Sequence, residues 1–261
     1  MAKAVDTVDA VPLIPGLKPS GTARKVVAPH DPKLTVGSVV FATPDEVEPA
    51  MAAALKGFKV WSRTSAEARG VILERAADQL EANRDRLLSL LAREGGKTIE
   101  DGISEVREAT DFLRYYANRG REMFSAMQVM PGPTGEDNRL GWRGRGVFAC
   151  IAPWNFPLAI FIGQVTAALA AGNAVIAKPA EQTPLIAAEA VRLAHRAGIP
   201  GDVLQLLPGD GPGVGGPLVA DPRIAGVAFT GGTDTARRIN RTLAEREGPI
   251  VPLIAETGGQ N

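Results

Sequence analysis

The sequence predicts an α/β protein in which a doubly wound, parallel, five-stranded sheet follows a mainly helical amino-terminal segment. After Gly146, five short apolar runs recur with centres roughly 25 residues apart, and each gap between them has a helical composition. Before Gly146, apolar residues instead recur at helical spacing. Continuous apolar strands that alternate with helices are typical of a parallel sheet covered on both faces.

The composition is that of an ordinary globular protein. Of the 261 residues, 45% are hydrophobic and 22% are charged. Lysine plus arginine and aspartate plus glutamate both number 29, so the zero net charge predicts neither a nucleic acid nor a membrane surface as partner. No uncharged apolar stretch reaches the roughly 20 residues that a membrane helix needs. The single cysteine excludes an internal disulfide framework and predicts a cytoplasmic protein.

The chain divides into parts by these patterns. Residues 1–33 are rich in proline and small residues, show no period and predict an extended arm. Residues 34–141 predict a helical part that packs on the sheet domain, and residues 142–257 predict that domain itself. Within the helical part, residues 36–42 resemble a short strand, and a loop rich in glycine, proline and asparagine leads into the sheet.

Helix starts in the first half are marked by capping residues. Thr43–Glu46 combines a threonine cap, a proline in the first turn and a glutamate three residues on. Thr64–Glu67 repeats the capping spacing and predicts one long helix that ends at Gly95-Gly96. A further helix is predicted to start near Thr98.

Polar or glycine-rich turns follow all five apolar runs, at the edge where a sheet of this kind binds ligands. The turn after the first run, Pro153–Pro157, is stiffened by two prolines and carries the amide of Asn155. Lys178 and Glu181 follow the second run. A carboxylate at that position could accept hydrogen bonds from ribose hydroxyls.

The remaining turns strengthen this pattern. A turn with glycine at 209, 211 and 213 follows the third run, and Glu256 follows the fifth. The fourth run leads through Phe229–Thr233 into a helix, and small residues there let bare N–H groups approach a phosphate. Each turn alone is weak evidence, but five at one edge predict a nucleotide site.

Four other features resemble functional motifs and receive a structural interpretation. Gly211–Gly216 satisfies G-x-G-x-x-G but follows the third strand rather than the first, so it predicts a tight turn beside the cofactor. GGKT at 95–98 is not a phosphate-binding loop, because Leu91 stands where that loop needs glycine. Cys150 lies inside an apolar run and predicts a buried structural cysteine. His195 is interpreted as a surface or packing residue.

Several segments together resemble the aldehyde dehydrogenase superfamily. PWNFP, AGNAVIAKPAEQTP, VAFTGGT and ETGGQN stand in the order and spacing of that family, and EGGKT resembles one of its helical segments. The likeness runs from residue 30 to the end. LPGD, PGPTGEDN, GRGVFACIAPWNFPLAIFIGQV and IVPLIAETGGQN resemble, more narrowly, the pyrroline-5-carboxylate (glutamate-γ-semialdehyde) dehydrogenase module of the proline utilization A proteins. The fold implied is a Rossmann-like cofactor domain of an incomplete aldehyde dehydrogenase.

The resemblance implies roles for the residues at the strand ends. Asn155 would donate its amide to the oxyanion of a thiohemiacetal, and Glu256 would be the general base that activates water. Lys178 and Glu181 would hold the adenosine ribose, and a carboxylate there favours NAD over NADP. No metal site is assigned. The other cofactor contacts assigned are Ile151, Pro153, Trp154, Gly211, Pro212, Phe229, Thr230, Gly231, Gly232, Thr233, Thr257 and Gly258.

These contacts have specific expected partners on NAD. Trp154 would wall the nicotinamide side, and the turn at residues 211–212 would line the adenine cleft. The segment 231–233 would present a helix N-terminus to the pyrophosphate. Relatives commonly carry serine at Gly232, so pyrophosphate binding lacks one hydroxyl in this chain.

The activity implied is oxidation of a small aldehyde to a carboxylate with NAD. Family members attack the aldehyde with a cysteine thiolate that lies beyond Glu256, in a second domain. Residues 258–261 are therefore interpreted as the start of a missing catalytic domain, and the chain alone is expected to be inactive. The complete enzyme is expected to be a homo-oligomer, an expectation that does not extend to this chain alone.

Two alternatives stay open. One is a non-catalytic nucleotide-binding or interaction protein derived from an aldehyde dehydrogenase. The other is a stand-alone dehydrogenase with its own acid–base pair, which the positions of His195 and Cys150 disfavour.

Overall fold

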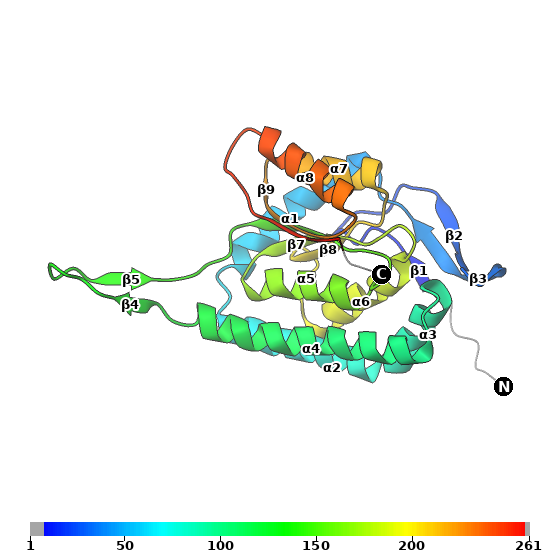
Figure 1. Cartoon of the computed structure of the whole chain (residues 1–261), viewed down its shortest axis with the longest axis horizontal. Coiled ribbons are helices and arrows are strands. Elements are labelled where there is room, and N and C mark those ends of the chain that lie inside the picture. The colour runs from blue at the N-terminus through cyan, green and yellow to red at the C-terminus, as the bar shows by residue number, and fades with distance from the viewer. Residues whose placement is uncertain (1–7, 259–261) are drawn as a thin grey trace.

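The computed structural model describes residues 8–258, and its centre is a five-stranded parallel sheet between two layers of helices (Figure 1). The strand order is β10-β9-β6-β7-β8. The chain builds the sheet outward from β6 to β8 and then returns to the other side of β6, which is a doubly wound topology. The predicted fold class is confirmed. The strands are β6 Val147–Ile151, β7 Ala174–Lys178, β8 Leu204–Leu206, β9 Ile224–Gly231 and β10 Leu253–Thr257.

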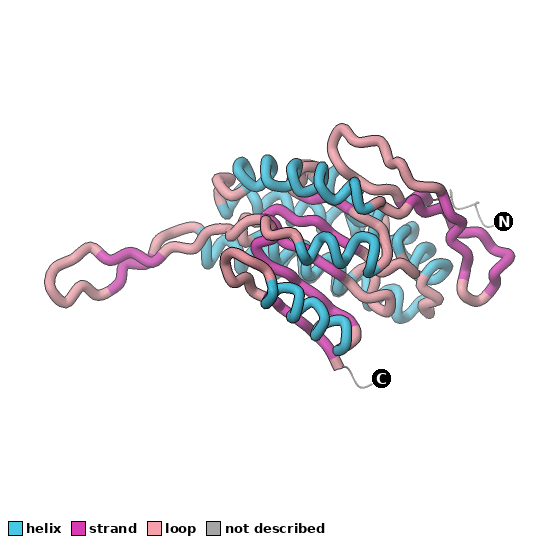
Figure 2. The backbone as a smooth tube through the Cα atoms, turned by 90° about the horizontal axis from the view of Figure 1, so that it is seen from above, coloured by secondary structure: helices cyan, strands magenta, loops and turns pink. Residues whose placement is uncertain are grey.

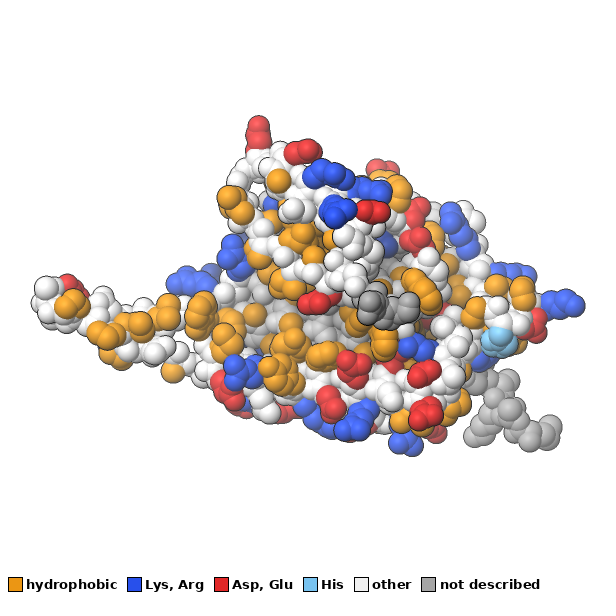
Figure 3. Space-filling view, in the orientation of Figure 1, with side chains coloured by type: hydrophobic (Ala, Val, Ile, Leu, Met, Phe, Trp, Pro, Cys, Tyr) orange, Lys and Arg blue, Asp and Glu red, His pale blue; other side chains and the backbone are white. Residues whose placement is uncertain are grey.

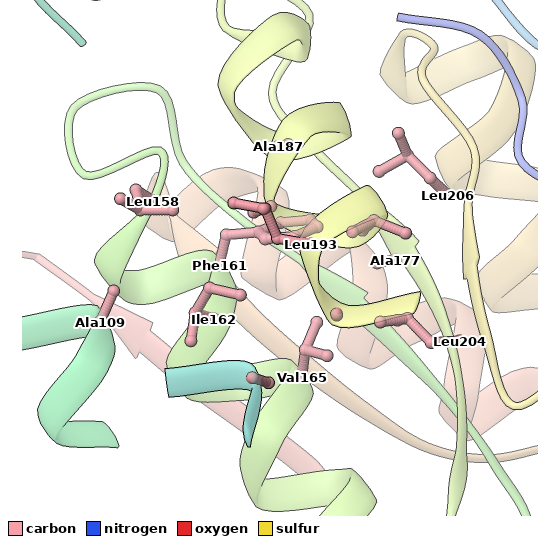
Figure 4. Close-up of a cluster of buried hydrophobic side chains, with 14 of the residues drawn as sticks. Ala109, Leu158, Phe161, Ile162, Val165, Ala177, Ala187, Leu193, Leu204 and Leu206 are labelled. Carbon is pink, nitrogen blue, oxygen red and sulfur yellow. The ribbon is translucent and has the colours of Figure 1, made fainter. Parts of the chain in front are cut away.

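Different helices cover the two faces of the sheet (Figures 1 and 2). Every residue of β6 and β7 is buried, which explains why these strands read as continuous apolar runs. In Figure 4, Phe161, Val165, Leu193 and Leu204 gather in the core of one face. That face is covered by α5 Ala159–Ala170 and α6 Pro184–Ala197, and the opposite face by α1 Val47–Trp61, α7 Gly216–Ala220 and α8 Thr233–Glu245.

An outer helical layer packs on α5 and α6 (Figure 1). It consists of α2 Ala66–Ala82, α3 Arg84–Glu94 and α4 Ile99–Phe124. The helix predicted as a single unit is two helices, because the chain breaks at Asn83, where φ is −108° and the side-chain amide donates to the Gln79 carbonyl. Among the described residues, no helix combines the length and apolar character needed to cross a membrane.

The helix caps agree with the sequence patterns except at one position. Thr43 and Glu46 form the predicted capping box ahead of α1, around the short turn η1 Pro44–Glu46. α4 starts directly after Thr98, as predicted, and Thr98 caps it by accepting a hydrogen bond from the Asp101 N–H. The cap of α2, however, is Ser65 and not the predicted Thr64, whose hydroxyl instead donates to the Val60 carbonyl.

The amino-terminal segment contains strands that the pattern of residues 1–33 does not reveal. These strands, β1 Val8–Ala10 and β2 Ala23–Ala28, form a three-stranded sheet with β3 Asp31–Val40 in the order β1-β3-β2. β3 contains most of the short strand predicted at residues 36–42. Between β1 and β2, the Leu13 N–H donates to the Leu206 carbonyl at 2.9 Å. This contact places the amino-terminal segment along the β8 edge of the central sheet. Residues 1–7, in the expected arm, and residues 259–261, in the expected start of a further domain, lie outside the described residues.

A β-hairpin projects from the body where the sequence predicts a loop (Figure 1). It pairs β4 Gln128–Met130 with β5 Asn138–Leu140. Apolar side chains lie along its surface (Figure 3), and Val129 is 72% exposed. Glycine and proline in this stretch conceal the strands, because each strand is only three residues long.

Glu94, at the end of α3, caps the start of α6 from a distance. Its carboxylate oxygens accept hydrogen bonds from the Leu185 N–H at 2.7 Å and the Ile186 N–H at 2.9 Å. Burial raises the pKa of Glu94 to about 8, although these two donors act in the opposite direction. The carboxyl group therefore keeps its proton to a higher pH in the folded protein than in the unfolded chain.

This pKa difference predicts that stability falls as pH rises. Between the unfolded pKa of 4.5 and the folded value of about 8, the folded state binds more protons, so the free energy of unfolding declines with pH. Glu94→Gln should flatten this decline, because the amide does not titrate. Urea unfolding of both proteins between about pH 5 and pH 8 measures the two slopes. Identical slopes would contradict the assignment.

Candidate functional site

The carboxyl ends of the central strands surround a cleft of about 1150 Å³. The cleft lies where the winding of the sheet reverses, between β6 and β9, which is the ligand position in doubly wound folds. Every residue predicted from the sequence as catalytic or cofactor-binding lines this cleft. They are Ile151, Pro153, Trp154, Asn155, Lys178, Glu181, Gly211, Pro212, Phe229, Thr230, Gly231, Gly232, Thr233, Glu256, Thr257 and Gly258.

The turn after β6 and the end of β10 bring an amide and a carboxylate to the same cleft. Asn155 lies in the turn between β6 and α5, and the neighbouring Trp154 is 58% exposed. Glu256 lies on β10 opposite Thr230 of β9, and its side chain is exposed. The site therefore combines a hydrogen-bond donor with a carboxylate that is free to meet water.

The end of β7 carries a buried cation, Lys178, and the turn after it carries an exposed carboxylate, Glu181. Lys178 is 5% exposed, and its ammonium group donates to the Pro179 carbonyl at 3.1 Å. Burial lowers the pKa of Lys178, while the charges of Glu181 and Asp210 act against that shift. Glu181 itself is exposed at the cleft, where a carboxylate can accept hydrogen bonds from a ligand.

The start of α8 presents backbone donors to the cleft. Its N-cap is Gly232, and no side chain caps this helix start. The carbonyl of Gly232 accepts bonds from the N–H groups of Thr235 and Ala236, whereas the N–H groups before them have no partner within the helix. A Cβ atom on Gly232 would meet nothing within 4 Å. Serine would therefore fit at this position, and glycine there leaves the backbone accessible.

A side chain from α5 fixes the strand-end threonine of β9. The Gln164 amide nitrogen donates to the Thr230 hydroxyl oxygen at 2.9 Å. Since Thr230 lines the cleft and pairs with Glu256 across the sheet, this contact links α5 to both strands.

One face of α8 also lines the cleft, and the sequence interpretation missed it. Thr235, Arg238, Ile239 and Thr242 recur at i, i+3, i+4 and i+7 from the helix start. That spacing is the detectable signal, because residues so spaced share one helix face. Phe156 and Ile160 were missed for a different reason: apolar residues near a strand end carry no chemical signature.

The features that resemble motifs behave as structural elements. Cys150 is 1% exposed, and burial raises the pKa of its thiol to about 12, which confirms the structural interpretation. Gly211–Gly215 forms a single helical turn, η2, capped by the Asp210 carboxylate, as the tight-turn interpretation predicts. His195 bonds through Nε2 to the Leu204 carbonyl at 2.9 Å and is absent from the cleft lining, as expected of a packing residue.

Comparison with known proteins agrees with this geometry. Residues 17–261 match the model of the aldehyde dehydrogenase family. Bifunctional protein PutA of Escherichia coli is 46% identical over 255 residues, covering 97% of this chain and 18% of that protein. A crystal structure of proline utilization A from Bradyrhizobium japonicum is 62% identical, with a TM-score of 0.82 over 84% of this chain and 22% of that one.

This chain covers a larger share of the proteins in a second group of solved structures. The structure of 1-pyrroline-5-carboxylate dehydrogenase from Thermus with bound NAD is 34% identical, with a TM-score of 0.92 over 97% of this chain and 50% of that one. The chain thus spans about half of that dehydrogenase and about a fifth of the bifunctional proteins. The family match covers most of the sequence and the whole cleft, and the chain therefore belongs to the aldehyde dehydrogenase family.

Proposed function

We propose that this chain is the NAD-binding part of an aldehyde dehydrogenase that oxidises L-glutamate-γ-semialdehyde to a carboxylate. The observation that carries the proposal is the convergence of all the predicted cofactor and catalytic residues on one cleft. The substrate class rests on the names of the relatives, which are PutA and 1-pyrroline-5-carboxylate dehydrogenase proteins. Because the chain spans only part of those proteins, the activity of the complete protein belongs to the proposal.

The residues present fit a dinucleotide. The uncapped start of α8 offers N–H donors and the positive end of a helix dipole, which suit a pyrophosphate. Glu181 would accept hydrogen bonds from the adenosine ribose, with Lys178 beside it, and the turn at residues 211–212 would line the adenine. The carboxylate of Glu181 would repel a 2′-phosphate, which favours NAD over NADP.

Asn155 and Glu256 would act on the aldehyde. NAD, when bound, accepts the hydride that leaves the substrate. The Asn155 amide would donate a hydrogen bond to the oxygen on which negative charge develops, and a fixed donor of this kind stabilises the transition state. Glu256 would take a proton from water during hydrolysis of the covalent intermediate. Its exposure on β10 gives water access to the carboxylate.

The proposal also covers the cellular compartment and the oligomeric state of the complete enzyme. We infer that the complete enzyme works in the cytoplasm as a homo-oligomer, with a small aldehyde as its substrate. The free, buried cysteine supports a reducing compartment. The alternative, a non-catalytic nucleotide-binding protein, would use the same cleft for the cofactor alone.

The test of the cofactor site is the affinity for NAD. Glu181→Ala should weaken NAD binding about 10- to 150-fold, because it removes a charged hydrogen-bond partner worth about 1.5–3 kcal/mol. Isothermal titration calorimetry measures both affinities. Glu247→Ala is the matched control, because Glu247 is an exposed carboxylate outside the cleft lining. Equal affinities of the two variants would contradict the assignment of Glu181.

A further inference from the structure

The GGKT segment, residues 95–98, has no role in the proposed cofactor site, yet it lies beside that site. It connects α3 to α4, and Thr98 caps α4. Lys97 is the one charged residue of the segment. Its ammonium group points inward, and only 14% of its side chain is exposed. A lysine held this way needs an explanation, because lysine side chains usually reach solvent.

Glu105 of α4 is the carboxylate that Lys97 meets, and it also caps α5. The side chain of Glu105 has no exposed surface. One oxygen, Oε1, accepts hydrogen bonds from the Leu158 N–H at 2.8 Å and the Ala159 N–H at 3.3 Å. No side chain of the adjoining turn caps α5. The start of α5, directly after the turn that carries Asn155, is therefore held by a residue some fifty positions earlier in the chain.

Lys97 completes the contact on the other oxygen and extends it to the turn. Its Nζ lies 3.1 Å from Glu105 Oε2, an ion pair that compensates the buried carboxylate. The same Nζ lies 4.0 Å from the centroid of the Phe156 ring, a cation–π distance. Phe156 lines the cleft, is 40% exposed and directly follows Asn155. The pair thus contacts the turn after β6 at two points, Phe156 and Leu158.

The end of α3, directly before this connector, holds the start of another helix beside the cleft. Glu94, directly before Gly95, caps the start of α6, which follows the turn that carries Lys178 and Glu181. The two helices that follow the first two strand-end turns are therefore both capped by carboxylates of the helices that flank the connector, Glu94 of α3 and Glu105 of α4. An ion pair that served only to join the connector to α4 would need neither the Phe156 ring nor the Leu158 N–H as a partner.

We propose that Lys97 and Glu105 are positioning residues that hold the segment Trp154–Phe156 in the geometry in which Asn155 faces the cleft. The cation fixes the Phe156 ring directly after Asn155, and the carboxylate fixes the backbone of Leu158 two residues further along the turn. The significance of this geometry for oxyanion binding rests on the proposed function. The conformational claim itself does not depend on a cofactor.

Trp154 reports directly on this segment. Labelling with 5-fluorotryptophan gives a ¹⁹F NMR resonance for each of Trp61, Trp142 and Trp154, and Trp154→Phe assigns the third. Lys97→Met should shift and broaden the Trp154 resonance and leave the other two unchanged. Lys97→Arg should restore it, because arginine keeps both the charge and the cation–π contact. Lys33→Met, at an exposed lysine of β3, is the matched control and should change none of the three.

A second variant separates positioning from stability. Phe156→Leu removes the ring without touching the buried ion pair, so it should alter the Trp154 resonance as Lys97→Met does, even if Lys97→Met does not fold. An unchanged Trp154 resonance in Phe156→Leu, or in a folded Lys97→Met protein with a lowered melting temperature, would overturn the proposal and leave a purely structural ion pair.

Adding NAD to the unsubstituted protein tests the proposed function separately. A Trp154 resonance that does not respond to NAD would count against the cofactor site. The response to Lys97→Met, measured without NAD, would still decide whether Lys97 positions the turn.

Discussion

The purified 261-residue chain should form no NADH from an aldehyde, although we expect it to bind NAD. Aldehyde oxidation through a covalent intermediate needs a thiolate beside the nicotinamide. The sole cysteine, Cys150, lies within β6 and is 1% exposed. Burial raises the pKa of its thiol to about 12, so almost none of it is ionised near neutral pH. The role proposed for Glu256, activation of water, would come only after a covalent intermediate exists.

The measurement is NADH absorbance with glutamate-γ-semialdehyde, run beside the same chain extended by the catalytic half of a relative. The extended protein should turn over, and Cys150→Ser should leave its rate unchanged. Turnover by the short chain that persists after Cys150→Ser would show that the chemistry needs no cysteine. Turnover that disappears with Cys150→Ser would instead show that this thiol reaches the cleft.

Gly57→Ala should lower the free energy of unfolding by about 1–3 kcal/mol, the cost typical of overpacking. Gly57 lies in α1 where that helix meets the chain entering β8. A Cβ there would lie 2.2 Å from the carbonyl oxygen of Asp202 and 2.9 Å from the Val203 nitrogen. Both are backbone atoms, so the helix itself must move, and α1 covers one face of the sheet.

Gly102→Ala is the matched control for this substitution. Gly102 also lies inside a helix, but its nearest neighbour would be the flexible Leu88 side chain at 3.1 Å. There the higher helix propensity of alanine, worth about 1 kcal/mol, should offset the contact. Urea unfolding of the two variants measures the difference. Equal stabilities would show that α1 accommodates the extra atom by a small shift.

Sequence alone predicts the cleft well because a parallel sheet restricts where side chains can go. Once five apolar runs alternate with helices, the residues after each run must meet at one edge, so Asn155, Lys178 and Glu256 converge without knowledge of any contact.

The features that sequence does not reveal depend on partners far along the chain. The strand at Val8–Ala10 is recognisable only through its pairing with β3, and the contact of Gly57 with Asp202 joins positions that share no pattern. Lys97 and Glu105 carry no distinguishing pattern in the sequence, and only the fold brings them to the start of α5 and to Phe156. Local patterns carry no information about such pairs.

The contact between Leu13 and Leu206 has a consequence for synthesis on the ribosome. The two residues are separated by roughly 190 positions, and translation adds about 5–20 residues per second, so Leu13 waits about 10–40 s for its partner. Contacts of such high sequence separation also slow folding. We therefore expect the segment around Leu13 to leave the ribosome before its partner strand is made and to dock late, so that chaperones can reach it during that interval.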